Sequence, residues 1–190
     1  MNLNPIIVIG LPRSGTSVVA RLLQENLNIM MDEGPIRKDS LNPYGYYEDH
    51  KLVGINSRML NRWKANDKNS KNVDRLWAIE FTAWIVSRSM KYKKWGFKDP
   101  RLVGFLPWVV QYFNNATWIV CDRKERQIIK SQVTKLGISL ENAVAGIRAE
   151  KALIEKYVCD YNIIDMSHYY PENELIKYLD RVIYGDSKDR

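Results

Sequence analysis

Two kinds of hydrophobic pattern alternate along the chain. Short, unbroken apolar runs predict buried strands at residues 6–10, 94–97, 116–121 and 162–166. Between and around them, apolar residues recur every three or four positions and predict helices at residues 15–28, 48–64, 73–92, 101–113, 124–136, 139–160 and 171–184. We expect the fourth helix to kink or restart at Pro107. Two polar segments, 32–47 and 65–74, predict loops, and the second is expected to be the most mobile part of the chain.

Strands that alternate with helices are typical of a parallel sheet covered by helices on both faces. We therefore expect a three-layer α/β fold with about four or five strands. The 190 residues suffice for one domain with a substantial core, and we predict a single domain over residues 1–190. Ligands of such sheets bind beyond the carboxyl ends of the strands. The chemistry is therefore expected at residues 10–17, 98–101, 122–124 and 165–169.

The segment "GLPRSGTS", residues 10–17, follows the first predicted strand and opens the first helix. Gly10 and Gly15 keep the glycine spacing of a phosphate-binding P-loop, in which the backbone turns around an anion and directs its N–H groups inward. Thr16 stands where that motif has its lysine, and Arg13 supplies a cation from within the loop instead. The pattern predicts an anion site in a P-loop NTPase-like fold. The alternative is a tight turn between strand and helix.

Two further polar segments lie at predicted strand ends. Arg123 ends the third strand, and Ser131 lies eight residues later in the next helix, so both side chains can reach one anion. The segment "WGFKDPRL" places Lys98, Asp99 and Arg101 after the second strand. These residues either face the same crevice, or Asp99 caps a helix that begins with proline and forms an ion pair. Both interpretations can hold together, with Lys98 facing the ligand.

A net charge of +7, from 29 basic and 22 acidic residues, favours an anionic ligand or partner. The basic residues are scattered and no nucleic-acid-binding motif is present, so we expect no nucleic-acid partner. Cys121 and Cys159 lie in apolar stretches and are expected to be packed, reduced thiols. The chain shows no secretory signal and no apolar run of the ~18 residues that span a membrane. These features predict a soluble, cytoplasmic protein.

The first loop resembles the 5′-phosphosulfate loop of sulfotransferases that use 3′-phosphoadenosine 5′-phosphosulfate (PAPS), which carry P-[KR]-[SG]-G-T-[ST] after the first strand. The resemblance implies PAPS as donor, 3′,5′-adenosine bisphosphate (PAP) as product, and no metal. Arg123 and Ser131 match the family's ligands of the 3′-phosphate, although Lys124 and Glu125 replace the usual Asp or Asn and Pro. The resemblance assigns the 5′-phosphate to Arg13, Ser14, Gly15, Thr16 and Ser17.

Two other stretches are similar to bacterial and phage sulfotransferase-like sequences. One is the K-D-P-R run at residues 98–101, and the other is "NPYGYYEDHKL" at residues 42–52. Sulfuryl transfer needs cations that neutralise the leaving phosphate and a base that takes the acceptor's proton. Arg13 and Lys98 are the candidate cations.

The resemblance implies Glu48 as the catalytic base, with His50 as the second choice and Asp49 as the third. The alternative is that this segment only begins a helix, whose first turn favours acidic residues. The neighbouring Tyr44, Tyr46 and Tyr47 either line an acceptor pocket or pack against the core.

The predicted activity is transfer of a sulfuryl group from PAPS to a hydroxyl or amine of a small-molecule or carbohydrate acceptor. A P-loop kinase or ATPase is the main alternative, because "WIVCD", residues 118–122, resembles a Walker B strand. Thr16 in place of lysine disfavours that alternative. A catalytically inactive protein that binds PAPS or PAP is another, because the R-K-G-x-x-G loop of larger sulfotransferases is missing. A nucleic-acid module is the least favoured.

Overall fold

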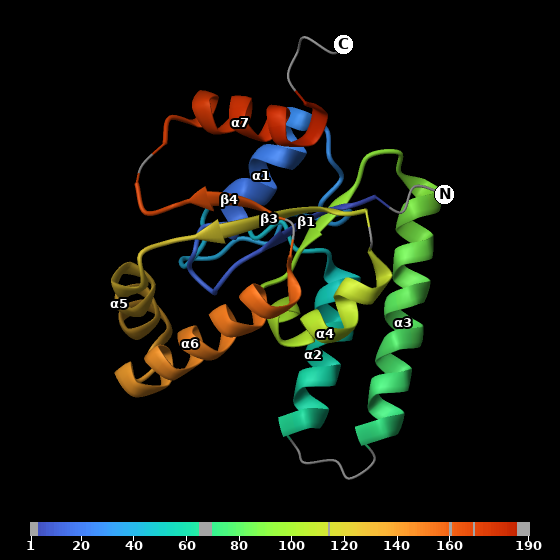
Figure 1. The fold of residues 1–190 in the computed structure, drawn as a ribbon, viewed down its shortest axis with the longest axis horizontal. Coiled ribbons are helices and arrows are strands. Elements are labelled where there is room, and N and C mark those ends of the chain that lie inside the picture. The colour runs from blue at the N-terminus through green and yellow to red at the C-terminus, as the bar shows by residue number, and fades with distance from the viewer. Residues whose placement is uncertain (1–3, 65–69, 114, 160, 169, 186–190) are drawn as a thin grey trace.

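A parallel sheet forms the centre of the computed structural model, which describes residues 4–64, 70–113, 115–159, 161–168 and 170–185 (Figure 1). Within these residues the sheet has four strands in the order β2-β1-β3-β4: β1 (Ile6–Ile9), β2 (Gly96–Lys98), β3 (Thr117–Asp122) and β4 (Asn162–Asp165). Ile6 pairs with Gly96 on one side and with Thr117 on the other, always in parallel. The predicted α/β fold with a parallel sheet is confirmed.

Helices cover both faces of this sheet (Figure 1). The described α-helices are α1 (Thr16–Leu27), α2 (His50–Lys64), α3 (Ser70–Lys91), α4 (Leu106–Val109), α5 (Glu125–Leu136), α6 (Leu140–Tyr157) and α7 (Glu172–Tyr184). α1 and α7 pack on one face, whereas α2, α3, α4 and α6 pack on the other. α5 packs against α6 beside the second face. The result is the three-layer arrangement that the sequence predicts.

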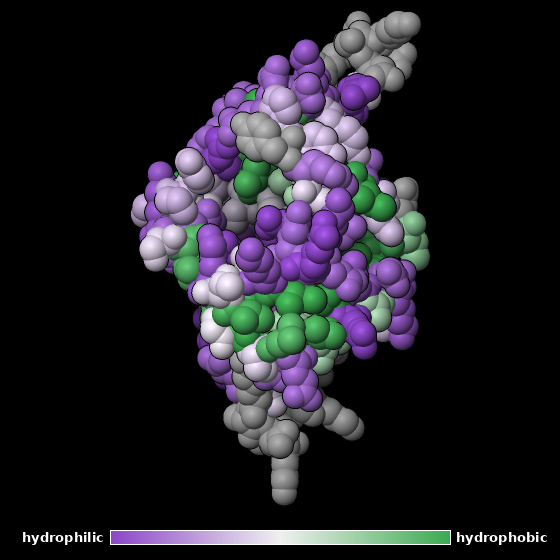
Figure 2. All heavy atoms as spheres, turned by 90° about the vertical axis from the view of Figure 1, so that its left-hand side faces the viewer, coloured by the Kyte–Doolittle hydropathy of each residue, from purple (hydrophilic) through white to green (hydrophobic). Residues whose placement is uncertain are grey.

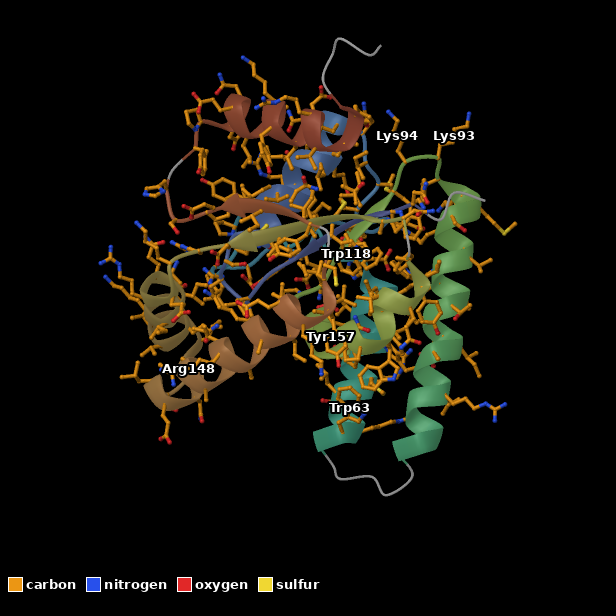
Figure 3. The ribbon with its side chains drawn as sticks, viewed as in Figure 1. Trp63, Lys93, Lys94, Trp118, Arg148 and Tyr157 are labelled. Atoms are coloured by element: carbon orange, nitrogen blue, oxygen red, sulfur yellow. The ribbon has the colours of Figure 1, made fainter. Side chains whose placement is uncertain are left out.

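Each face of the sheet has its own hydrophobic core, because successive strand residues point to opposite faces. Ile6 and Val8 of β1 join the core under α1 and α7. Ile7 and Ile9 join the larger core on the other face. Trp118 of β3 belongs to this larger core, and Figure 3 shows it above α6, which carries Tyr157. A single sheet therefore holds both cores in place.

Several element boundaries differ from the prediction. The expected helix at 101–113 is divided into a 3-10 helix η1 (Pro100–Phe105), the short α4 and a second 3-10 turn η2 (Val110–Tyr112). The expected restart at Pro107 is confirmed, because a proline lacks the N–H that a continuous helix needs and instead occupies the first turn of α4. α3 begins at Ser70, so the predicted loop 65–74 is too long, and residues 65–69 lie outside the described residues.

The two cysteines have different environments. Cys121 is buried in β3, and burial raises the pKa of its thiol to about 12. Cys159 is exposed, so the prediction of two packed thiols is wrong for this residue. The reason is that α6 already ends at Tyr157, which leaves Cys159 in the connection to β4. In the described part of the chain, no helix is long and apolar enough to cross a membrane.

The strand order brings two loops together at the carboxyl ends of the two central strands, β1 and β3. From β1 the chain continues to β2 on one side of β1, and later to β3 on its other side. Ligands of open α/β sheets bind where the strand order changes direction in this way. The loop after β1 contains Arg13, and the turn after β3 contains Arg123. The fold therefore places both predicted anion-binding segments beside the same crevice.

Candidate active site

The loop after β1 approaches its neighbours so closely that two positions accept only glycine. A Cβ atom on Gly10 would lie 2.6 Å from the carbonyl oxygen of Cys121. Gly15 has a positive φ of 99°, and a Cβ there would lie 2.9 Å from Cε of Met166. No side chain of the described residues caps α1, and the N–H groups of Val18 and Val19 donate to the carbonyl oxygen of Gly15. The N–H groups of Thr16 and Ser17 therefore remain for an anion, and the helix dipole favours negative charge there. The local geometry is compatible with the predicted phosphate-binding loop, residues 10–17, which we call the phosphate loop.

Side chains from the two strand ends meet around this loop. Nε of Arg13 donates a hydrogen bond to Oγ of Ser131, at 3.0 Å, although the residues are 118 positions apart. Nη1 of Arg123 donates to the carbonyl oxygen of Arg13 at 3.1 Å. A third contact runs from Nε2 of Gln132 on α5 to the carbonyl oxygen of Pro12, at 3.2 Å. The predicted ligands of the 5′- and 3′-phosphates therefore form one connected group.

Lys98 at the end of β2 links this group to the predicted base. The side chain is 1% exposed. Its Nζ donates to Oγ of Ser17 at 3.1 Å and to Oε1 of Glu48 at 2.6 Å. Burial lowers the pKa of Lys98, and the neighbouring Glu48 carboxylate opposes that effect. Lys98 is therefore a buried amine between the phosphate loop and a carboxylate.

Glu48 receives hydrogen bonds from three basic side chains. Besides Lys98, its Oε2 accepts from Nη2 of Arg37 at 3.2 Å and from Nη2 of Arg101 at 3.3 Å. A carboxylate offers about four acceptor positions, so one remains for a substrate proton. The residue before it, Tyr47, has a positive φ of 52° and is itself buried in the core. This turn of the backbone directs Glu48 toward the phosphate loop.

The other predicted bases lie elsewhere. Asp49 is buried, and its Oδ1 accepts from the backbone N–H groups of Lys51 and Leu52, so it caps α2. Its Oδ2 accepts from Nη1 of the buried Arg88 at 3.2 Å. His50 lines a separate cavity of about 450 Å³ between α2 and α3. The structure thus brings Glu48, and neither of the two alternatives, to the phosphate loop.

Asp99 has the structural role that the sequence analysis offered as an alternative. Its Oδ1 accepts from the backbone N–H of Arg101 at 3.0 Å and caps η1. Oδ2 accepts from Nδ2 of Asn56 and from Nε of Arg101. Burial raises the pKa of Asp99, and the Arg101 guanidinium opposes that effect. Asp99 positions Arg101 and η1, while the adjacent Lys98 faces the ligand side.

These side chains line a cavity of about 620 Å³. Its charged lining consists of four basic side chains and two carboxylates: Arg13, Lys98, Arg101, Arg123, Glu48 and Glu150. A second cavity of about 360 Å³ adjoins it and shares Ser17, Val18 and Asn42 with it. Tyr46 lines the first cavity and Tyr44 the second. The excess of positive charge suits a polyanionic ligand.

Comparison with known proteins identifies the family. A family model described as the sulfotransferase family matches residues 5–162. The chain belongs to the sulfotransferase family. The matched segment contains all the predicted phosphate-binding residues as well as Lys98 and Glu48. Membership supports a sulfotransferase activity in general.

A solved structure agrees with this fold. The crystal structure of TT1252 from Thermus thermophilus has a TM-score of 0.58 and 14% sequence identity, over 95% of this chain and 97% of that one. At this identity the likeness concerns the fold alone. No curated protein matches the chain.

The sequence analysis of this sulfotransferase missed several groups at the site. Arg37 lies in a polar loop without a pattern, so nothing in the sequence indicated its contact with Glu48. Glu150 was also missed, although a carboxylate within an apolar helical stripe is a detectable signal. Ser14 was predicted as a ligand; it is buried, and its Oγ makes no hydrogen bond with any of the described residues. Among the described residues no cluster of His, Cys, Asp and Glu is placed to hold a metal ion.

Proposed function

We propose that the protein transfers a sulfuryl group from PAPS to a hydroxyl or amine of a small-molecule or carbohydrate acceptor. The observation that carries the proposal is the convergence of Arg13, Arg123 and Ser131 where β1 and β3 end. The phosphate loop would bind the 5′-phosphosulfate through its N–H groups and Arg13. Arg123 and Ser131 would bind the 3′-phosphate. Arg13 donates a hydrogen bond to Ser131, so the two side chains lie close enough for both to contact a bound nucleotide.

Lys98 and Glu48 supply the groups for the transfer step. The bond between sulfur and the bridging phosphate oxygen breaks while the acceptor's oxygen or nitrogen bonds to sulfur. Glu48 takes the acceptor's proton, and PAP leaves with its charge neutralised by Arg13 and Lys98. The 2.6 Å contact between Lys98 Nζ and Glu48 Oε1 supports this division of roles, because it places the base beside the cation.

The adenine ring of the donor would occupy the cavity beside the phosphate loop. This cavity begins at Ser17 and Val18 of α1 and is lined by Tyr44, Met166 and His168 among others. Flat aromatic and apolar side chains suit a purine ring. These residues would replace the contacts that larger sulfotransferases obtain from their R-K-G-x-x-G loop.

We also propose a cytoplasmic location. Both cysteines are free thiols, and one of them is exposed. An exposed thiol is maintained best in a reducing compartment.

Thermal unfolding with added ligands tests the donor. PAP at about one hundred times its dissociation constant stabilises a protein by about 2.7 kcal/mol, which corresponds to a rise in Tm of about 5–10 °C here. We expect this rise with PAP and no comparable rise with ATP and Mg²⁺. Arg123→Ala should abolish most of the effect. Arg126→Ala, which removes an exposed arginine from the first turn of the following helix α5, serves as the control.

Other results would support the alternatives. Stabilisation by ATP with Mg²⁺ and not by PAP would indicate a P-loop kinase or ATPase. Binding of PAP without transfer from PAPS to any acceptor in a broad panel would indicate an inactive nucleotide-binding protein. If Arg123→Ala binds PAP as well as the wild type, the proposed 3′-phosphate site is wrong.

A further inference from the structure

One side of α6 faces the interior of the molecule, and it carries a carboxylate among apolar residues. Ala143, Ile147 and Ile154 lie on this side and are buried. Glu150 occupies the same stripe, one turn after Ile147 and one turn before Ile154. The helical pattern predicts an apolar residue at such a position. Arg148, labelled in Figure 3, is by contrast exposed on the same helix.

The Glu150 side chain lines the 620 Å³ cavity that the phosphate loop also lines. It makes no hydrogen bond or ion pair with any of the described residues. The next residue, Lys151, pairs instead with Glu125, at 3.1 Å, and with Asp122. Burial alone raises the pKa of Glu150 to about 7. Glu150 is thus a half-buried carboxylate that faces a cavity and has no partner among the described residues.

The lining of the cavity that Glu150 faces contains both apolar and charged side chains. Leu60 of α2 and Leu136 of α5 contribute apolar side chains, and α6 itself packs against η1 and α5. The charged groups of the remaining lining are Arg13, Lys98, Arg101, Arg123 and Glu48. The four basic side chains of this set suit the phosphates and the sulfuryl group of the donor. A carboxylate that lines this cavity without a partner among the described residues suits a cationic group of a second ligand.

We propose that Glu150 binds a positively charged amine of the acceptor. The acceptor would then carry its reacting hydroxyl or amine at one end, an ammonium group elsewhere, and an apolar portion between them that contacts Leu60 and Leu136. This inference rests on the proposed function, because it assumes that the basic part of the cavity holds the donor. The donor itself carries negative charge and would be repelled by this carboxylate. Glu150 is therefore a specificity residue for the acceptor.

Binding of three matched probes to the PAP-loaded protein tests the proposal. Tyramine carries a phenol and an ammonium group, 4-ethylphenol lacks the ammonium group, and 3-(4-hydroxyphenyl)propionate carries a carboxylate instead. Calorimetry at pH 8 should show that tyramine binds at least about tenfold more tightly than the other two. Glu150→Gln should bring tyramine to the level of 4-ethylphenol and leave the affinity for PAP within about twofold. Glu155→Gln, an exposed position on α6, is the matched control.

The pH dependence of tyramine binding provides a second readout that does not depend on turnover. Tyramine binding should weaken as the pH falls below about 7, where Glu150 takes up a proton. Glu150→Gln should lose this pH dependence, whereas the Glu155→Gln control should keep it.

Three results would overturn the inference: equal binding of the probes to the wild type, no binding of tyramine at all, or the same preference for tyramine in Glu150→Gln. A large loss of PAP affinity in Glu150→Gln would also overturn it, since Glu150 would then serve the donor. Failure of PAP to bind the wild type is a different result, and it would refute the proposed function itself.

Discussion

At the scale of single residues, Glu48 is the group on which the proposed chemistry depends. Glu48→Gln keeps the shape of the side chain, but it replaces one acceptor oxygen with an NH2 donor and removes the base. We expect turnover to fall by about 10²-fold or more, because general-base catalysis contributes 10²–10⁴-fold. PAP binding should persist. The measurement is the initial rate of transfer from PAPS, together with calorimetry of PAP binding.

Glu33→Gln is the appropriate control for this variant. Glu33 also pairs with two basic residues, Arg88 and Lys91, but it lines the cavity between α2 and α3. Its loss should leave turnover unchanged. Near-normal turnover in Glu48→Gln would remove Glu48 from the role of base.

Glu150 provides a second prediction at this scale, which concerns stability. Because its pKa rises from 4.5 to about 7 on folding, the native state binds more protons than the unfolded state between these pH values. Stability therefore falls as the pH rises through this window and stays low above it. Glu150→Leu should therefore be more stable than the wild type at pH 8. Each kcal/mol of stability gained should raise Tm by about 2–4 °C.

The difference between Glu150→Leu and the wild type should shrink at pH 4.5, where the carboxyl group is protonated in the native state. Thermal unfolding of both proteins at the two pH values is the measurement. An equal difference at both pH values would mean that charge burial is not the cause. A gain in stability with a loss of tyramine binding would show a residue kept for function at a cost in stability.

At the scale of elements, the start of α2 depends on Asp49. This carboxylate caps the helix and also accepts from Nε1 of Trp84, at 3.0 Å, and from Arg88. Arg88 is 1% exposed, so removing its partner leaves a buried charge less well compensated. Asp49→Ala should therefore lower the free energy of unfolding by about 3 kcal/mol. Urea denaturation measures the change.

The surface pair of Arg58 and Glu80 provides the comparison for Asp49. It also joins α2 and α3, but both side chains are exposed. Glu80→Gln should change stability by less than about 1 kcal/mol. A loss below about 1 kcal/mol in Asp49→Ala would show that Glu33 and the backbone carbonyls suffice for Arg88.

The sequence predicted most of the elements because their signals are local. The strand runs, the glycine pair at 10 and 15, and the arginine that ends β3 each follow from a short pattern. The restart of the segment 101–113 near Pro107 also follows from a local signal, the proline itself. The place of His50 does not, because it depends on which way the backbone turns at Tyr47. Likewise, contacts such as Lys98 with Ser17 join residues 81 positions apart and carry no local signal.

At the scale of the whole molecule, the two cores share one sheet, and the proposed donor site lies where the strand order of that sheet changes direction. Alternate residues of β1 belong to opposite cores, so neither core can unfold while the other keeps β1 intact. We therefore expect one cooperative transition, with coincident unfolding by tryptophan fluorescence and far-ultraviolet circular dichroism. Tryptophans report mainly on the larger core, because Trp77, Trp84, Trp95 and Trp118 all lie there.

We expect PAP to stabilise both hydrophobic cores together, because they should unfold in one transition. PAP would bind at the loop after β1, between the ends of β1 and β3. It should therefore shift both spectroscopic transitions by the same amount. Separate transitions, or a shift of the fluorescence signal alone, would mean that the two faces unfold as independent parts. In that case the crevice would lie between two units rather than within one domain. Coincident transitions that move together would instead show that the phosphate loop, Lys98 and Glu48 are positioned by the sheet as a whole.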